Sequence, residues 1–356
     1  MRGALEEVLP DATLLIHPVS DGGEGLVEVV VAALGGQVVQ AEVRGPLPGQ
    51  RVEASYGLSG DASAAIIEMA QAAGLPLVPP ALRDPKVTTT VGVGDLIRAA
   101  LERGVSSILV GIGGSATNDG GAGMAEALGV RLLDAGGELL VRGGGALRKL
   151  HMIDLSGRDR RLERVSVAVA CDALNPLLGP SGASRVYGPQ KGATPADVEL
   201  LEGSLSRLAD VVHATMGMDI RDLPGGGAAG GLGAGLVAFC NGRLSRGIDL
   251  VLDMTGFDQQ LQSADLVITG EGKIDQQMRF GKALSGVLER AVRMRKPVAA
   301  VVGTVEGSKD RFQGPEGFVE ILSLVDETTG QEEAMARASH HLRNRTREIV
   351  RRLGLV

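Results

Sequence analysis

The chain has 356 residues, enough for two domains at about 100 to 200 residues each, and a formal net charge of −7. That charge, the lack of a Lys and Arg run, and a content of no Trp and two Tyr argue against a nucleic-acid partner. No apolar stretch approaches the roughly 18 residues that span a membrane. The two cysteines, Cys171 and Cys240, lie far apart in sequence, which argues against disulfides or zinc and favours the cytoplasm.

Apolar periodicity predicts strands and helices that alternate along most of the chain. In chain order the first predicted elements are a helix over 1–9, an extended segment over 12–19, a helix over 25–34, antiparallel strands within 37–70, a helix over 95–104, a strand over 106–110, a helix over 121–129, strands over 130–137 and 165–172, and a helix over 195–216. Those that follow are a strand over 264–270, a helix over 283–294, strands over 297–303 and 318–324, and a helix over 332–351. Such alternation is typical of parallel α/β sheets.

Glycine is unusually frequent, at 53 residues, which is about twice the average share of roughly 7%. Many glycines stand beside Asp, Glu, Asn, Ser or Thr in loops that follow apolar strands. These loops are residues 21–25, 111–123, 171–179, 225–236 and 269–277. Because the carboxyl ends of strands in an open α/β sheet face one crevice, we expect the loops to meet there and bind a ligand.

The first two loops share the sequence Asp-Gly-Gly, and each has a second interpretation. Asp21 and Glu24 have the spacing of a capping box, which starts a helix and binds nothing. Residues 111–116, with Asp134 at the end of the next strand, match a dinucleotide fingerprint, which indicates a nucleotide-cofactor dehydrogenase. However, Ser, Thr, Asn and Asp residues stand where the fingerprint starts its helix, and these suit a metal and a phosphate better.

The other three loops also have simpler interpretations. Asp172 can belong to an ordinary turn before Pro176. Residues 225–236 have the composition of a linker, although the apolar helix that follows favours an anion site at its N-terminus. The alternating charges of residues 269–277 are also typical of a solvated turn.

Charge limits what acidic glycine loops can accept. Two carboxylates about 6 Å from a phosphate each cost about 3 kcal/mol at an effective dielectric constant of 20. A phosphate in these loops therefore needs a cation, and Mg²⁺ held by carboxylates and phosphate oxygens is the usual one. The chain has no Walker, protein-kinase, zinc-protease or serine-hydrolase motif.

Together the loops resemble one family, the bacterial type I glycerate kinases. The stretches that carry the resemblance are "PVSDGGEG", "RDPKVTTTVGVGDLI", "GIGGSATNDGGAGM", "VACDALNPLLGPSGASRVYGPQKGA", "GAAGGLGAG" and "LVITGEGKIDQQ", in the order of the family. The resemblance runs from residue 1 to near the C-terminus. It implies an enzyme that transfers the γ-phosphoryl group of ATP, with Mg²⁺, to D-glycerate, and 2-phosphoglycerate is the product we favour.

The resemblance also implies the fold class, two α/β domains with the active site in the cleft between them. We expect a Rossmann-like or flavodoxin-like parallel-sheet domain from residues 1–40 and 245–356, and an inserted α/β domain from residues 41–244. Members of the family begin with an additional strand and a Pro-Asp-Ser loop, so we expect the true start of the protein to lie upstream of Met1. The expected partners are D-glycerate, a nucleotide and a second subunit in a homodimer, with neither nucleic acid nor membrane.

Phosphoryl transfer needs a base, metal ligands and groups that hold anions. The catalytic candidates are Asp172, Asp21 and Asp119. The substrate- and phosphate-binding candidates are Gly22, Gly23, Gly113, Gly114, Ser115, Thr117, Asn118, Arg185, Lys191, Gly230, Gly231 and Lys273. The metal candidates are Glu24, Glu271 and Asp275. Arg185 and Lys191 are included because a small acid needs a cationic clamp, and exposed surface charge is the alternative for both.

Two other functions stay open on the sequence alone. A dehydrogenase of a small hydroxy acid would use residues 111–116 for its cofactor and Asp134 for the ribose. A protein that only binds small acids would need the same cleft but would show no turnover.

Overall fold

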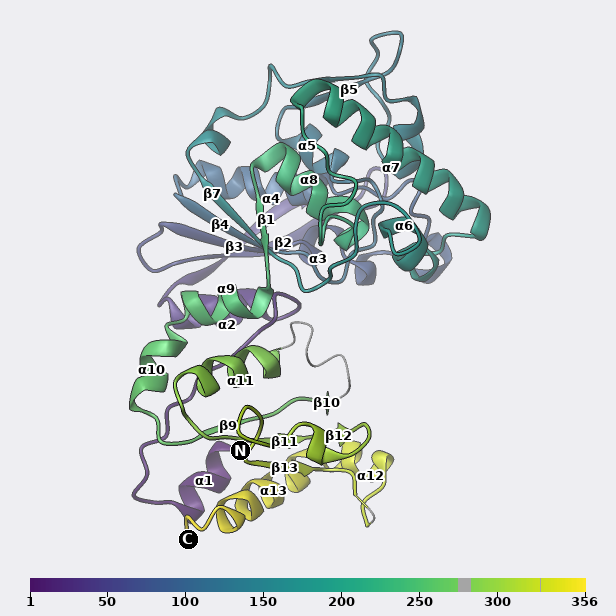
Figure 1. Cartoon of the computed structure of the whole chain (residues 1–356). Helices are drawn as coiled ribbons and strands as arrows, with labels where there is room; N and C mark the ends of the chain where they lie inside the picture. The colour runs from purple at the N-terminus through teal and green to yellow at the C-terminus, as the bar shows by residue number, and fades with distance from the viewer. Residues whose placement is uncertain (275–282, 327) are drawn as a thin grey trace. The chain divides into compact units, whose positions relative to one another are not determined.

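The structure, a computed structural model, describes residues 1–274, 283–326 and 328–356 (Figure 1). It has the mixed α/β fold with parallel sheets that the sequence pattern predicts. In the part of the chain that is described, no helix combines the length and the apolar character needed to cross a membrane.

The chain divides into two compact units. Unit 1 contains Met1–Val19 and Leu252–Val356, and unit 2 contains Ser20–Val251. Residues 20–40 and 245–251, which we expected in the discontinuous domain, therefore lie in the contiguous unit.

Unit 2 is built on a six-stranded sheet with the strand order β1-β2-β3-β4-β7-β8. Its strands are β1 (Gln37–Arg44), β2 (Arg51–Leu58), β3 (Ala64–Glu68), β4 (Ser107–Gly111), β7 (Ser166–Ala170) and β8 (Arg243–Ser245). Strand β2 pairs antiparallel with β1 and with β3, whereas β3, β4, β7 and β8 run parallel to one another. A separate antiparallel sheet contains β5 (Arg131–Leu133) and β6 (Met152–Asp154).

Helices cover both faces of the six-stranded sheet (Figure 1). The helices of unit 2 are α2 (Leu26–Ala33), α3 (Ala70–Ala73), α4 (Val91–Glu102), α5 (Ala122–Ala127), α6 (Ala183–Tyr187), α7 (Pro195–Met216) and α8 (Leu232–Cys240), and α9 (Gly247–Met254) runs across the boundary between the units. Short 3-10 helices span Leu75–Leu77, Pro80–Leu82, Gly144–Lys149, Arg160–Glu163, Pro189–Lys191 and Ala228–Gly231. Helix α2 packs on one face of the first three strands, and α4 and α8 lie on the other face.

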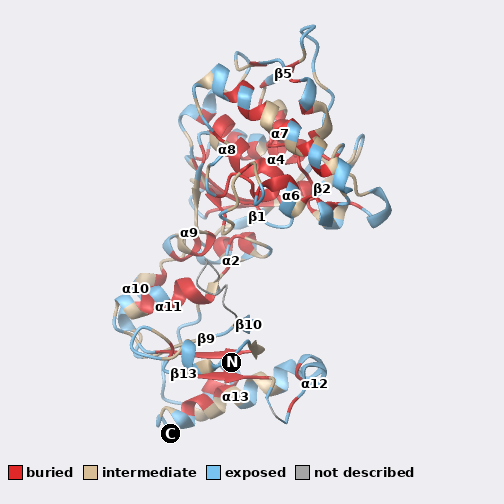
Figure 2. Ribbon diagram, turned by 45° about the vertical axis from the view of Figure 1, so that its right-hand side comes forward, coloured by how far each residue is buried: buried red, intermediate tan, exposed pale blue. Residues whose placement is uncertain are grey.

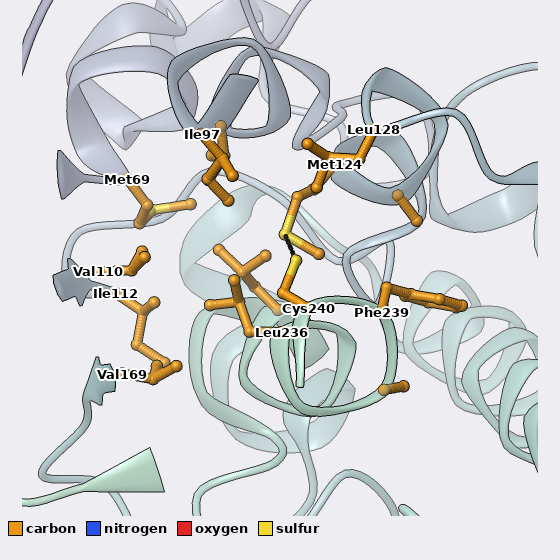
Figure 3. Packing of buried hydrophobic residues seen from close by; sticks show 14 of the residues in the cluster. Met69, Ile97, Val110, Ile112, Met124, Leu128, Val169, Leu236, Phe239 and Cys240 are labelled. Atoms are coloured by element: carbon orange, nitrogen blue, oxygen red, sulfur yellow. Dashed lines mark hydrogen bonds between the residues drawn. The ribbon is translucent and has the colours of Figure 1, made fainter. Parts of the chain in front are cut away.

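The main apolar core lies between this sheet and the α4 and α8 side (Figures 2 and 3). Ile108 and Val110 of β4 point into it, while Leu109 between them is buried on the opposite face, as the alternation of strand side chains requires. Cys240 Sγ lies 4.0 Å from Met124 Sδ at its centre (Figure 3). Each such fully buried side chain contributes about 1.5 to 3 kcal/mol, so this core holds the strand ends of unit 2 in place.

Unit 1 contains a three-stranded parallel sheet with the order β13-β11-β9 and a two-stranded parallel pair, β10 and β12. Its strands are β9 (Val267–Thr269), β10 (Lys273–Ile274), β11 (Val298–Val302), β12 (Thr304–Val305) and β13 (Glu320–Ser323). Its helices are α1 (Arg2–Val8), α10 (Phe257–Ser263), α11 (Ala283–Arg293), α12 (Gln331–Ala336) and α13 (Ala338–Arg352), with a 3-10 turn at Lys309–Arg311. Apolar residues of β11, β13, α12 and α13 form its core.

Most predicted elements are present, and two expectations are wrong. Residues 12–19 form no strand within the described structure, and Leu15 and Ile16 are about half exposed because no neighbouring strand covers them. The closing helix is two helices, because Arg337 leaves the helical region at φ −121° and ψ 32°. Helix α7 begins at Pro195 as predicted, and Thr194 and Asp197 cap it reciprocally.

Candidate functional site

The four parallel strands of unit 2 end side by side at one edge of the sheet. In sheet order their last residues are Glu68, Gly111, Ala170 and Ser245. A cleft of about 350 Å³ opens at this edge. Its walls are Asp21–Gly23, Ile112–Ser115, Ala170–Ala173, Ala228–Ala229, Leu75, Tyr187 and Gln190. Four of the five predicted glycine loops therefore contribute to one cleft, as expected for the carboxyl edge of an α/β sheet.

The Asp21 loop lies directly over the ends of β4 and β7. A Cβ atom on Gly22 would lie 2.5 Å from the Cβ of Ala170, and one on Gly111 would lie 2.3 Å from the carbonyl oxygen of Gly22. Gly22 also has a φ of +95°, which favours glycine. The backbone of this loop therefore approaches the sheet at a distance that only glycine permits, and the exposed Asp21 side chain is placed on the cleft.

The capping-box interpretation of this loop is wrong. Helix α2 begins at Leu26 with Gly25 as its N-cap, and Asp21 Oδ1 accepts a hydrogen bond from the Gly23 N–H at 3.3 Å. The helix is capped by another strand, because the buried Glu68 at the end of β3 accepts from the Val27 N–H at 2.9 Å. Glu24, a predicted metal ligand, is exposed and does not line the cleft.

Asp172, one residue after Cys171, is the partly buried carboxylate of the cleft. Burial raises its pKa to about 7, and the negative charge of Asp21 adds to this rise. The hydrogen bond from the Gly247 N–H to Asp172 Oδ1, at 2.9 Å, acts in the opposite direction. A carboxylate with a pKa near neutrality is suited to accept and return a proton.

The second glycine loop presents backbone N–H groups to the cleft. Gly113 and Gly114 are exposed, Gly114 has a φ of +71°, and Ser115 is buried at the cleft wall. In the described part of the chain, the N–H groups of these three residues have no protein acceptor. Free N–H groups that converge on a concave surface are suited to bind an anion.

Lys191 lies behind this loop and does not line the cleft, contrary to its expected role as a clamp. Its side chain is 1% exposed, and Nζ donates to Ser115 Oγ and to the Thr117 carbonyl oxygen, each at 2.7 Å. The surface-charge alternative for Lys191 is also wrong, because the side chain is buried.

Asp119, a predicted catalytic residue, lies in the interior of unit 2 and does not line the cleft. It is fully buried and accepts hydrogen bonds from the N–H of Thr90 at 2.9 Å, from the Thr90 hydroxyl at 3.0 Å, and from the N–H groups of Gly121 and Gly123 at 3.2 Å. Burial raises the pKa of Asp119, and the Thr90 and Gly123 N–H groups oppose the rise. Because its oxygens are used inside the fold, the side chain cannot reach a ligand in the cleft. Asp21 and Asp119 therefore have different roles despite their shared sequence.

Four further candidates support the cleft from behind. Thr117 and Asn118 are fully buried, and the Asn118 amide donates to Ser184 Oγ at 3.1 Å. A Cβ on Gly230 would lie 2.0 Å from the carbonyl oxygen of Thr117, and Gly231 packs on Gly120 in the same way. These positions are buried where two backbones approach closely, and none of them lines the cleft.

The segment before α8 is not a linker. It is buried, and Ala229 on the cleft wall has a φ of +54°, a conformation that costs a non-glycine residue about 1 to 3 kcal/mol. Backbone strain of this kind is frequent at functional sites.

Arg185, a predicted substrate clamp, is exposed and does not line the cleft. Its guanidinium group forms two hydrogen bonds to Glu199, at 2.6 and 2.9 Å, and neither residue lines the cleft. This placement favours the surface-charge alternative for Arg185.

The fifth loop belongs to unit 1. Glu271 is partly buried there, and Lys273 Nζ lies 2.7 Å from Glu306 Oε2. Asp275 lies outside the described residues. Among the described residues, no three His, Cys, Asp or Glu side chains lie close enough together to hold a metal ion.

The dinucleotide fingerprint does not have its required geometry. Helix α5 begins only at Ala122, so the glycines of residues 111–116 do not open it. Asp134 Oδ1 accepts from the N–H groups of Gly136 and Glu138 and so closes a local turn. The structure therefore gives no support to the alternative function, a dehydrogenase that binds a nucleotide cofactor at residues 111–116.

The fold and the cleft define an α/β protein whose carboxylates and free N–H groups suit the transfer of a group between anions. Residues 1–354 match the sequence model of a family described as "Glycerate kinase family". A glycerate kinase from Halalkalibacterium halodurans is 48% identical over 343 residues, 96% of this chain and 90% of that protein. A glycerate 2-kinase from Escherichia coli K12 is 50% identical over 299 residues, 84% of this chain and 78% of that protein.

A crystal structure of a protein assigned as glycerate kinase 2 from Salmonella typhimurium LT2 has a TM-score of 0.88 at 48% identity and covers 99% of this chain and 92% of that chain. The chain therefore belongs to the glycerate kinase family and is a kinase, as the resemblance implies.

Proposed function

We propose that this chain transfers the γ-phosphoryl group of ATP to the 2-hydroxyl group of D-glycerate, giving 2-phosphoglycerate and ADP. The family supports the kinase class, and the relative from Escherichia coli is named for the 2-position. The observation that carries the proposal is the convergence of Asp21, Asp172 and the free N–H groups of Gly113–Ser115 on one cleft.

Asp172 is the proposed base. In the transfer, the glycerate hydroxyl oxygen forms a bond to the γ-phosphorus, the bond from that phosphorus to the bridging oxygen of ADP breaks, and the hydroxyl proton passes to Asp172. A pKa near 7 leaves a large share of Asp172 ionised at neutral pH while it stays basic enough to hold the proton. The Gly247 N–H fixes Asp172 Oδ1, so the carboxylate is held in one orientation.

Mg²⁺ is the cation expected with ATP, and the donors of the cleft fit it. Asp21 is an exposed carboxylate on the cleft wall, and Mg²⁺ prefers one or two carboxylates together with phosphate oxygens. Asp21 is the residue that would hold the ion. When bound, the ion would neutralise charge on the transferred phosphoryl group.

A coupled assay of ADP release tests the function directly. With D-glycerate and Mg·ATP, we expect turnover that stops when Mg²⁺ is chelated. Phosphorus NMR of the product distinguishes 2-phosphoglycerate from 3-phosphoglycerate, and a 3-phosphate product would contradict the assigned position. Glycerate binding in calorimetry without ADP release would contradict the kinase and favour a small-acid binding protein.

We also infer a cytoplasmic location. Cys171 and Cys240 are both free and buried. Burial raises their pKa values to about 11 and about 12, so both thiols stay protonated and inert. Secretion of the tagged protein from cells that also retain a cytoplasmic marker would contradict this location.

A further inference from the structure

The cleft has an unusual charge balance for a site that binds an acid. Among the described residues that line it, two are carboxylates and none is Lys, Arg or His. The free N–H groups of Gly113–Ser115 are neutral donors. The buried Lys191 contacts this loop from behind, so it is a cation placed to act on an anion bound there.

When Lys191 is charged, its hydrogen bond to Ser115 has only one possible direction. An ammonium group has three donors and no acceptor, so Ser115 Oγ accepts from Lys191 Nζ at 2.7 Å. The serine hydroxyl has one proton, and that proton is left to be donated elsewhere. Ser115 lines the cleft, so the free proton is available to a ligand there.

We propose that Lys191 is a positioning residue that makes Ser115 a hydrogen-bond donor to the carboxylate of glycerate, which the Gly113–Ser115 loop binds. The second bond of Lys191, to the Thr117 carbonyl oxygen, fixes the loop from the other end. This inference rests on the proposed function, because it names the part of the substrate that the cleft binds.

The cost of burying this ammonium group supports a role for its charge. Burial lowers the pKa of Lys191 to about 7, and the negative charge of Asp119 acts in the opposite direction. A neutral amide would hold the same two acceptors without that cost. A bound carboxylate supplies the negative charge that the buried cation lacks on the cleft side, so the substrate and the charged form of Lys191 stabilise each other.

The test compares Lys191→Met and Ser115→Ala with the wild type. We expect each variant to raise the KM for glycerate about tenfold or more, the range of a lost hydrogen bond to a charged group, with the KM for ATP within about twofold. The double variant is expected to lose little beyond either single variant, because Lys191 acts through Ser115. Propylamine added to Lys191→Ala is expected to lower the KM for glycerate again.

Lys86→Met is the matched control, since Lys86 is paired with Asp197 at 2.6 Å and does not line the cleft. It is expected to leave both KM values unchanged. An unchanged KM for glycerate in Ser115→Ala and Lys191→Met, or an equal rise of both KM values, would overturn the inference. Turnover of glycerate by the wild type tests the proposed function separately. Wild-type turnover with unchanged KM values in the variants would overturn this inference alone, whereas a wild type without turnover would contradict the proposed function.

Discussion

Gly247 donates its backbone N–H to Asp172 Oδ1 at 2.9 Å, and its Cα lies against the backbone of Asp21. One glycine at the start of α9 thus connects the two carboxylates of the cleft. The sequence around Gly247 contains no motif that would indicate this role.

Gly247→Ala is expected to reduce kcat/KM about a hundredfold. The new Cβ would lie 1.8 Å from the Asp21 carbonyl oxygen, so the Asp21 loop must move, and a displacement of about 1 Å at a reacting group has an effect of this size. Steady-state kinetics measure it. Gly203→Ala in α7 is the control, because its Cβ meets nothing within 4 Å. The control is expected to keep full activity and to raise stability by about 0.5 to 1 kcal/mol.

Asp172→Asn is expected to lower kcat at least a hundredfold, because an amide cannot accept the proton. It also changes the pH dependence of stability. The folded pKa of about 7 exceeds the ordinary value of 3.8, so the stabilising contribution of Asp172 is present below about pH 4 and is lost as the pH rises to about 7.

The Asp172→Asn variant has no carboxyl group at this position, so its stability does not fall with the ionisation of Asp172. Without Mg²⁺ or nucleotide, its unfolding free energy relative to the wild type should therefore increase by about 1 kcal/mol or more between about pH 4.5 and pH 8. Urea unfolding at the two pH values measures the difference, and parallel curves for both proteins would contradict the raised pKa.

Asp119→Asn and Asp21→Asn are expected to separate fold from function. The Asp119 variant places an amide opposite four donors and should lose about 3 kcal/mol or more of stability, or fail to fold. The exposed Asp21 variant should keep its melting temperature within about 1 °C and lose most of its activity. Thermal denaturation and the ADP-release assay give both readings, and a stable but inactive Asp119→Asn would contradict the structural role.

Arg185→Ala is expected to have little effect. The pair with Glu199 is on the surface, so its loss should change stability by less than about 1 kcal/mol and leave the KM for glycerate within about twofold. Kinetics and urea unfolding check both values. A tenfold rise in the KM for glycerate would return Arg185 to the substrate site.

The parts of the site that the sequence predicts best depend on local patterns. Strands such as β4 and β7 are short apolar runs that end in polar glycine loops, so their carboxyl ends and the loops that follow were predictable. The strand expected over residues 12–19 depended on the same kind of pattern but has no neighbouring strand among the described residues. Apolar content alone does not make a strand when pairing is absent.

The two Asp-Gly-Gly loops show the same limit for the site. Asp21 and Asp119 are each followed by Gly-Gly, yet one is exposed on the cleft and the other is fully buried. Glu68 caps a helix 41 residues before it in the chain, and Lys191 reaches Ser115 across 76 residues. Contacts at such separations arise only when the sheet brings its strand ends together.

The sequence by itself determined the α/β class, the glycine loops at strand ends and the family, because each depends on residue type and short spacing. Only the tertiary structure decided which polar groups face the cleft and which serve the fold. The physical reason is burial: a carboxylate or an ammonium group inside the protein must use its hydrogen bonds on the groups packed around it, and the chain order does not specify those groups.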